Sequence, residues 1–115
     1  MSIIDNFEAM LARGQDSALL RYGLGNAYLK AQQPDRAAEH LALAVRQDPD
    51  YSAAWKLYGQ ALAALAQHTQ AIDAFDQGIA TAQRKGDIQA AKEMRVFRKR
   101  AAQGAIRTDV LTSIP

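Results

Sequence analysis

The side chains best suited to catalysis are few in this sequence and lie far from one another. Cysteine is absent, so the chain has no thiolate to act as a nucleophile or as a metal ligand. The two histidines, His40 and His68, have no second ligand at metal-binding spacing. We expect His40 on a solvated or half-buried helix face and His68 in a polar turn. Neither is therefore predicted to bind a metal ion or to act as a general base.

The serine, glycine and aspartate residues also lack the patterns of a reaction centre. No serine stands in the glycine-framed turn that exposes a nucleophile, and two serines are better explained as helix caps. The run Gly23-Leu24-Gly25 opens no predicted helix and follows no strand, unlike a phosphate-binding loop. Asp73 and Asp76 share a helix face, and nothing around them suggests tuned acidity. The sequence therefore predicts a protein that is not an enzyme and that has no cofactor and no metal.

The composition favours one helical domain. Of the 115 residues 49% are hydrophobic, Pro occurs at only three positions, and β-branched runs are absent. The first residues lack the basic and long apolar regions of a signal peptide. No segment approaches the roughly 18 uninterrupted apolar residues that a membrane span needs. We therefore expect a cytoplasmic protein without a membrane-spanning segment.

The sequence repeats itself with a pitch of 34 residues. Shifting it by this amount superimposes residues of similar size and hydrophobicity. The aligned pairs are Gly25 with Gly59, Ala37 with Ala71, Leu41 with Phe75, Val45 with Ile79, Leu24 with Tyr58, and Tyr28 with Leu62. The last two pairs hold the same two side chains in exchanged order, which keeps their summed volume unchanged.

These residues resemble the tetratricopeptide repeat, whose 34-residue pattern is W-x2-L-G-x2-Y, then A-x3-F, then P. The first copy of the pattern reads Arg21, Leu24, Gly25, Tyr28, Ala37, Leu41, Pro49, and the second reads Trp55, Tyr58, Gly59, Leu62, Ala71, Phe75, Gln83. Arg21 thus replaces the tryptophan of the first copy, and Gln83 replaces the proline of the second. The resemblance implies an all-α fold, a right-handed stack of helix–turn–helix pairs that ends in a C-terminal capping helix.

In this family the glycine lies where two antiparallel helices touch. A glycine inside a helix costs roughly 1 kcal/mol relative to alanine. We interpret Gly25 and Gly59 as positions of close helix contact, where denser packing offsets that cost.

Capping and turn residues predict the helix boundaries. The expected helices cover residues 18–31, 35–46, 52–65, 70–83 and 87–104. We predict one domain over residues 1–107, made of a half repeat at 3–12, repeats at 18–51 and 52–85, and the capping helix at 87–104. The half repeat continues the apolar column of Leu41 and Phe75 with Phe7. Residues 108–115 have no periodicity and are predicted to form a flexible tail.

The capping helix departs from the repeat pattern. Glu93 falls where the pitch places Gly25 and Gly59, so the register has decayed there. We expect this helix to pack on one side only and to need no glycine for close approach.

By resemblance, the first helix of each pair lines a concave groove that binds a peptide or protein. The resemblance implies the groove positions of the two repeats, and a pitch of 34 extends them to the last helix. These residues are Leu19, Tyr22, Asn26, Leu29, Lys30, Lys56, Gln60, Met94, Phe97 and Arg98. The small Ala63 and Ala64 leave room between them. Met94 and Phe97 fit a packed core as well as they fit a groove. The set predicts a partner with apolar anchors and some negative charge.

One known use of the family is the capture of a C-terminal carboxylate by lysine, asparagine and arginine. Only Asn26 matches that arrangement, because Tyr22 and Leu57 stand at two of the other positions. The sequence therefore does not predict a carboxylate clamp.

Two further functions are compatible with the sequence. The basic run Lys92–Arg100 could attract nucleic acid or an acidic partner, although a solvated capping helix explains the same residues. Self-association into an oligomer is the other, because the incomplete pairs at both ends expose helix faces.

Overall fold

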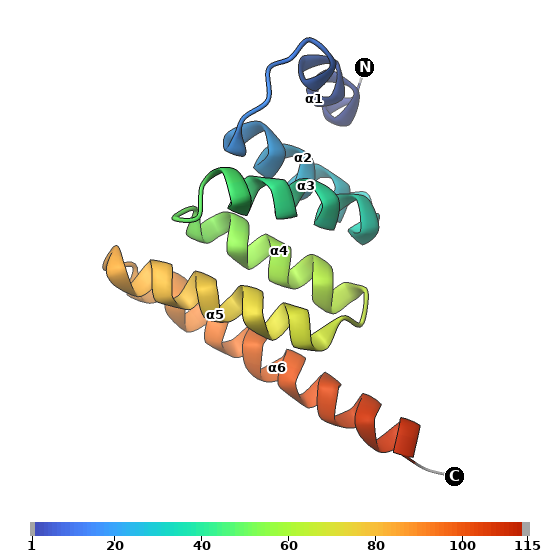
Figure 1. Ribbon diagram of the computed structural model, residues 1–115, viewed down its shortest axis with the longest axis vertical. Helices are drawn as coiled ribbons and strands as arrows, with labels where there is room; N and C mark the ends of the chain where they lie inside the picture. The colour runs from blue at the N-terminus through green and yellow to red at the C-terminus, as the bar shows by residue number, and fades with distance from the viewer. Residues whose placement is uncertain (1, 114–115) are drawn as a thin grey trace.

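The computed structural model describes the backbone of residues 2–113 and the side chains of residues 2–107. Within this range every regular element is an α-helix. The helices are α1 (Ile3–Ala12), α2 (Ala18–Lys30), α3 (Pro34–Gln47), α4 (Ser52–Ala64), α5 (His68–Arg84) and α6 (Ile88–Ser113). They follow one another down the long axis of a molecule that measures 51 × 37 × 20 Å (Figure 1). None of these helices combines the length and the apolar character needed to cross a bilayer.

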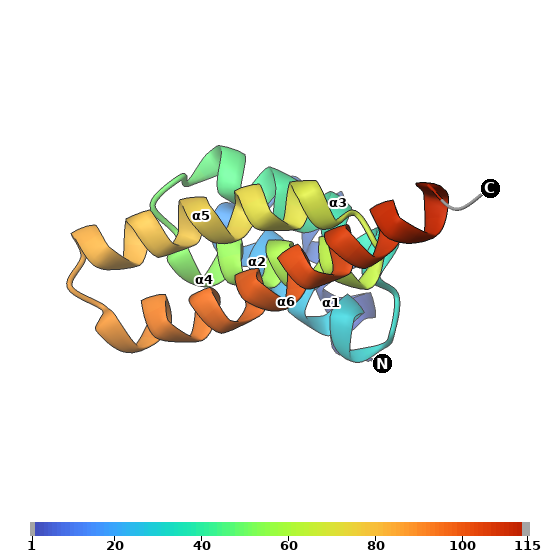
Figure 2. The same ribbon diagram turned by 90° about the horizontal axis from the view of Figure 1, so that it is seen from below.

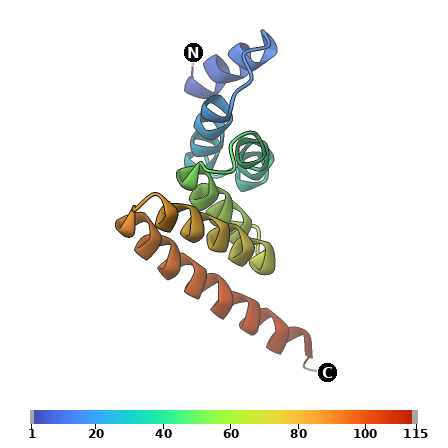
Figure 3. The same cartoon turned by 60° about the vertical axis from the view of Figure 1, so that its left-hand side comes forward.

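The helices form antiparallel pairs that stack on one another (Figure 3). Helix α2 packs against α3 and α4 against α5, while α1 precedes the first pair and α6 follows the second. The predicted fold class, an all-α stack of helix pairs with a C-terminal helix, is confirmed.

Local residues fix the starts of the helices. The hydroxyl oxygens of Ser2 and Ser17 accept hydrogen bonds of 3.1 Å from the backbone amides three residues later, which caps α1 and α2. Pro34 is the first residue of α3, where its missing amide hydrogen costs nothing. Helix α5 begins at His68 rather than at residue 70, so the prediction that His68 lies in a turn is wrong.

Four helices end in the same kind of turn. A residue in the left-handed region follows each of them: Gly14 at φ 85°, Gln32 at 60°, Ala66 at 59° and Gly86 at 76°. The amide of the next residue then donates to a carbonyl five positions back, as from Gln33 to Tyr28. Glycine reaches this conformation without strain, whereas Gln32 and Ala66 carry a Cβ atom that disfavours it.

The repeated glycines lie where each pair is closest. A Cβ atom on Gly25 would stand 2.4 Å from Leu41 Cγ, and one on Gly59 would stand 2.4 Å from Phe75 Cε1. Both Leu41 and Phe75 are buried. Any side chain at either glycine would therefore force the two helices apart, which supports the interpretation drawn from the sequence.

Helix α1 packs less deeply than the others. Phe7 lies against Gly23 of α2, where a Cβ atom would be 2.9 Å from Phe7 Cε2. Ile4 and Leu11 also contact the cluster formed by α2 and α3, yet no residue of α1 is buried. The half repeat is thus covered on one side only.

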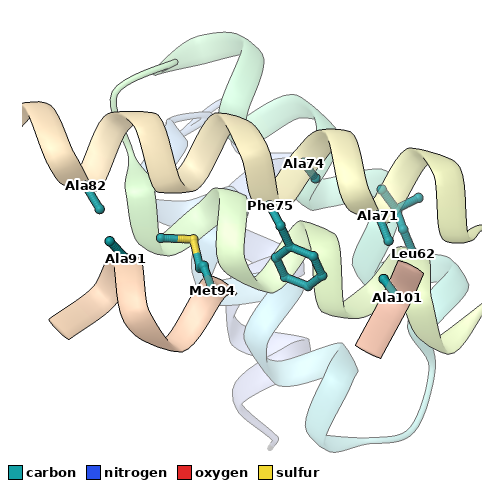
Figure 4. Packing of buried hydrophobic residues seen from close by; sticks show 8 residues of the cluster. All are labelled: Leu62, Ala71, Ala74, Phe75, Ala82, Ala91, Met94 and Ala101. Atoms are coloured by element: carbon teal, nitrogen blue, oxygen red, sulfur yellow. The ribbon is translucent and has the colours of Figure 1, made fainter. Parts of the chain in front are cut away.

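The last two helices run antiparallel and side by side (Figure 2). Their interface consists of Ala71, Ala82, Ala91 and Ala101 around the larger Phe75 and Met94 (Figure 4). The small residues allow the two helices to approach along most of the length of α5.

The length of α5 changes the register of α6. Helix α5 has 17 residues, whereas the equivalent α3 has 14. The extra three residues shift the pitch from 34 to 37, so that the buried Ala54 of α4 corresponds to the buried Ala91 of α6.

Two expectations for α6 are corrected. The helix does need glycine for close approach, because Met94 Sδ lies 2.4 Å from the Cβ position of Gly78, and the His68 ring lies 2.6 Å from that of Gly104. The helix also continues to Ser113 instead of ending at residue 104. The predicted flexible tail is therefore helical over residues 108–113, and its last two residues lie outside the described range.

Candidate interaction surface

Helices α2, α4 and α6 are the first helices of their pairs, and α4 contacts both of the others. They form one face of the stack, which we call the inner face. Its α2 portion holds Leu19, whose exposed fraction is 71%, and the exposed Lys30. Tyr22, Asn26 and Leu29 are half-buried beside them. All five residues predicted for α2 are thus accessible to a partner.

The α1 end of the inner face contains a hollow of about 670 Å³. Its lining is mostly apolar and comes from α1, α2 and the connection between them. The lining residues are Phe7, Met10, Gln15, Asp16, Ser17, Leu19, Leu20, Tyr22 and Gly23. Tyr22 closes one side, because its ring packs 4.9 Å from that of Tyr51. This arrangement offers a large apolar contact area next to the most exposed leucine of the face.

The middle of the inner face is polar. Lys56 of α4 donates a 2.7 Å hydrogen bond to Glu93 of α6, and both side chains are partly exposed. Gln60 is half-buried one helical turn further along α4. An exposed pair of this kind contributes about 0.2–1 kcal/mol, so a charged partner can compete for either member at small cost.

A second, smaller hollow of about 220 Å³ lies between α4, α5 and α6. Gln60, Ala63 and His68 form one side of it, and Phe97 and Arg100 form the other. The Arg100 guanidinium lies 5.8 Å from the centre of the Phe97 ring. This hollow therefore combines an aromatic wall with a positive charge.

Two predicted groove residues lie elsewhere. Met94 is fully buried against Gly78, so it belongs to the core (Figure 4). Arg98 forms an ion pair with Asp76 of α5, and this contact raises the pKa of Arg98. Both errors follow from the pitch of 34, because the pitch of 37 places Glu93 and Arg100 on the inner face instead. Phe97 remains on this face, half-buried and stacked on Phe75 at 6.0 Å.

A polar cluster that the sequence did not predict joins α1, α2 and α3. Arg21 donates hydrogen bonds of 2.9 and 2.8 Å to the two carboxylate oxygens of Asp16, and its Nη1 lies 3.1 Å from His40 Nδ1. Glu8 of α1 accepts a 2.8 Å hydrogen bond from the Tyr28 hydroxyl and lies 3.4 Å from His40 Nε2. This cluster holds the half repeat against the first full pair.

The cluster shifts the acidities of its members. The hydrogen bond from Arg21, with a second one from Gln47, holds the pKa of Asp16 well below its usual range. Burial lowers the pKa of His40 in spite of the nearby Glu8. The Arg21 guanidinium can only donate, so His40 Nδ1 accepts and His40 is neutral. The cluster has a structural role, because its side chains form hydrogen bonds and ion pairs with one another.

Across residues 2–107 no group of three or more His, Asp or Glu side chains is arranged to hold a metal ion.

Comparison with known proteins agrees with this geometry. The sequence model of the tetratricopeptide repeat family matches residues 4–52 and 22–88, which together cover most of the chain. The chain belongs to the tetratricopeptide repeat family. A repeat-containing protein of this family from Pseudomonas aeruginosa is 55% identical over 95 residues, which make up 83% of this chain and 90% of the relative.

Solved structures show the same tetratricopeptide fold. The solution structure of a Bordetella parapertussis protein is 43% identical, covers 90% of both chains and superimposes with a TM-score of 0.76. The TPR2B domain of yeast Sti1, solved in complex with pHsp70, reaches a TM-score of 0.80 at 18% identity and covers 87% of this chain and 80% of that chain. At that identity the likeness concerns the fold alone.

Proposed function

We propose that the chain is a non-catalytic cytoplasmic adaptor that binds a peptide or protein segment along the inner face. Tetratricopeptide domains commonly serve as protein-interaction modules, as the yeast Sti1 domain does in its complex. The observation that carries the proposal is the pair of hollows at the two ends of the inner face. The small residues Ala53, Ala63 and Ala64 of α4 leave room along the face for an extended contact.

The charges of the inner face favour a partner with acidic residues. Lys30 and Arg100 are exposed, and neither has a carboxylate partner within residues 2–107. Lys56 would exchange Glu93 for a carboxylate of the partner. Apolar anchors in the two hollows and acidic residues between them therefore match the face best.

The outer face of α6 fits the role of a cap. Lys92, Arg95 and Lys99 are exposed at the positions where a following helix would pack, and they surround the exposed Ile88 and Val96. Charged residues there favour water over another helix, as terminal repeats require. Because Arg98 is already paired with Asp76, we favour this role over nucleic-acid binding.

A pull-down from native cell extract tests the proposal. Tyr22→Ala removes an aromatic wall of the first hollow, and Lys56→Glu reverses the charge at the centre of the face. We expect each variant to lose at least about nine-tenths of the captured partner, which corresponds to roughly 1.4 kcal/mol or more.

Lys99→Glu is the matched control, because it makes the same charge change on the outer face of α6. It should retain the partner, and circular dichroism should show that all three variants keep their helix content. Retention of every partner by both Tyr22→Ala and Lys56→Glu would disprove the assignment of the inner face.

A further inference from the structure

The hollow beside α1 occupies the place of a missing helix. In both complete pairs the second helix presents a large residue, Leu41 or Phe75, to the glycine of the first helix. Phe7 holds the same place in α1, but no helix in residues 2–113 lies on the corresponding side of it. The 670 Å³ hollow lies there instead.

The walls of this hollow suit a helix. Phe7 and Met10 supply the α1 side, and Leu19 and Gly23 supply the α2 side. The side chains of Phe7, Met10 and Leu19 are apolar, and the Phe7 ring lies over Gly23, so the wall between α1 and α2 is closed and smooth. A helix placed here would contact α1 as α2 contacts α3, and would lie parallel to α2.

A recurring polar contact predicts the charge of the missing helix. In the first pair Asp16, just before α2, accepts a 3.0 Å hydrogen bond from Gln47 at the end of α3. In the second pair Asp50, just before α4, forms a 2.8 Å ion pair with Arg84 at the end of α5. Each pair thus joins an acid before its first helix to a donor at the end of its second.

Arg13 is the corresponding donor at the end of α1. It is the C-cap of that helix and is exposed, and it has no acidic partner within the described side chains. An acidic residue at the start of an incoming helix would complete the contact. It would also stabilise that helix through its dipole.

We propose that this hollow binds an amphipathic helix of the partner protein, which stands in as the missing first helix of the pair that α1 begins. The helix has an acidic residue at its start and an apolar stripe with glycine or alanine opposite Phe7. This inference rests on the proposed function, because it describes the segment of the partner that binds at the α1 end of the inner face.

A second copy of the chain fits the hollow less well. The accessible face of α6 presents Lys92, Arg95 and Lys99 beside the exposed apolar Ile88, Val96 and Ile106. These cations would meet the apolar Phe7 and Met10 and would repel Arg13. Asp87 does give α6 an acidic start, but Val96 stands where α4 has Gly59 and would collide with Phe7. The three cations and Val96 therefore favour a different protein over a second copy.

A peptide with the sequence of residues 50–66 of this chain is a suitable probe. It has the features required of a first helix, with Asp50 before the helix and Gly59 at the contact position. The peptide, acetylated and amidated, is titrated into the full chain by calorimetry. We expect saturable binding that weakens at least about tenfold with Gly59→Leu in the peptide, because the larger residue collides with Phe7.

Variants of the chain locate the binding site. Leu19→Ser should lower the affinity of the chain for the peptide about tenfold. Ile88→Ser is the matched control and should leave that affinity unchanged, since Ile88 is similarly exposed but lies at the start of α6. Arg13→Glu should weaken it a few-fold at low salt. A peptide with Asp50→Lys should recover that loss.

Equal affinity for the original chain and Leu19→Ser, or no binding of the peptide, would overturn the inference. It would also be overturned if sedimentation showed a dimer that Leu19→Ser dissociates, since a second copy would then fill the hollow. If the peptide fails while Tyr22→Ala and Lys56→Glu still lose their partner, the helix inference alone is wrong. If those variants keep their partner too, the proposed function fails with it.

Discussion

The two repeats differ most at the position where the family pattern has tryptophan. The first repeat has Arg21, which is tied to Asp16 and His40. The second has Trp55, which packs on Tyr58 with ring centres 6.3 Å apart, contacts Gly78 through its Cβ, and donates a 2.8 Å hydrogen bond to the carbonyl of Pro49. One backbone position thus supports either an ion-pair network or an aromatic contact.

The neighbours of each residue explain the difference. Trp55 is half-buried and packs against apolar clusters on both sides, one formed with α5 and α6 and the other with α3. Arg21 lies near α1, which covers the first repeat with one short helix and leaves a polar boundary. A charged network suits that boundary, because its groups can satisfy one another while remaining partly hydrated. The two repeats should therefore respond differently to mutation and to pH.

Trp55→Ala should have the largest effect. Removing the indole leaves a cavity between α4, α5 and α6, and we expect a loss of about 3 kcal/mol in the free energy of unfolding. Urea denaturation at several pH values measures it. The loss should be the same across the range, because the indole carries no charge and its hydrogen bond goes to the backbone carbonyl of Pro49. A loss below about 0.5 kcal/mol would mean that packing in the second repeat does not depend on the indole.

Arg21→Ala should lower the free energy of unfolding by a smaller amount, about 1–3 kcal/mol. The substitution leaves His40 Nδ1 and the Asp16 carboxylate without their main hydrogen-bond donor. Arg21→Lys should recover only part of that free energy, because an ammonium cannot form the two parallel bonds to Asp16. Urea denaturation of both variants at neutral pH gives the values. An unchanged free energy of unfolding in Arg21→Ala would show that the network does not stabilise the contact of α1 with α2 and α3.

Acidification should have the smallest effect on the free energy of unfolding, and this effect should come from His40 in the first repeat. The folded protein has a His40 pKa below the usual 6.5, so the unfolded chain binds more protons in this range. Stability is therefore complete above about pH 6.5 and falls as the pH drops toward the folded pKa. Besides Glu39 and Arg36 on its own helix, the groups around His40 are Glu8, Arg21 and Tyr28.

His40→Gln should flatten this slope between about pH 6.5 and 5 while keeping a hydrogen-bonding side chain. Below the usual carboxyl pKa of 3.8, protonation of Asp16 adds a separate loss that the variant does not remove. Thermal unfolding followed from pH 8 to pH 5 checks the prediction. An unchanged slope in His40→Gln would assign the acid sensitivity to another group.

Much of the fold could be predicted because the packing rule is local and repeats. A glycine opposite Leu41 or Phe75 at a fixed pitch fixes which helix faces touch, and the structure has both contacts. The half repeat followed from the same reasoning, since Phe7 continues that column.

The register of α6 could not be predicted by extending the pitch. One additional turn in α5 moves every later residue by three, which placed Met94 and Arg98 on the inner face and left out Glu93 and Arg100. Gly78 could have revealed the changed register. It lies inside the predicted helix 70–83, and the first repeat has no glycine at the equivalent position, so it indicates a close contact of another helix there. The polar cluster around Arg21 was harder to foresee, as its members come from three helices. Arg21 at a tryptophan position was the only sign that a carboxylate lay nearby.

The left-handed turns at Gln32 and Ala66 have a practical consequence. Both residues are exposed at the ends of helices and line neither hollow of the inner face, and both hold a conformation that glycine would adopt without strain. These two sites offer a way to make the chain more robust while leaving its binding chemistry untouched. Damaging substitutions elsewhere could then be studied in a background that still folds.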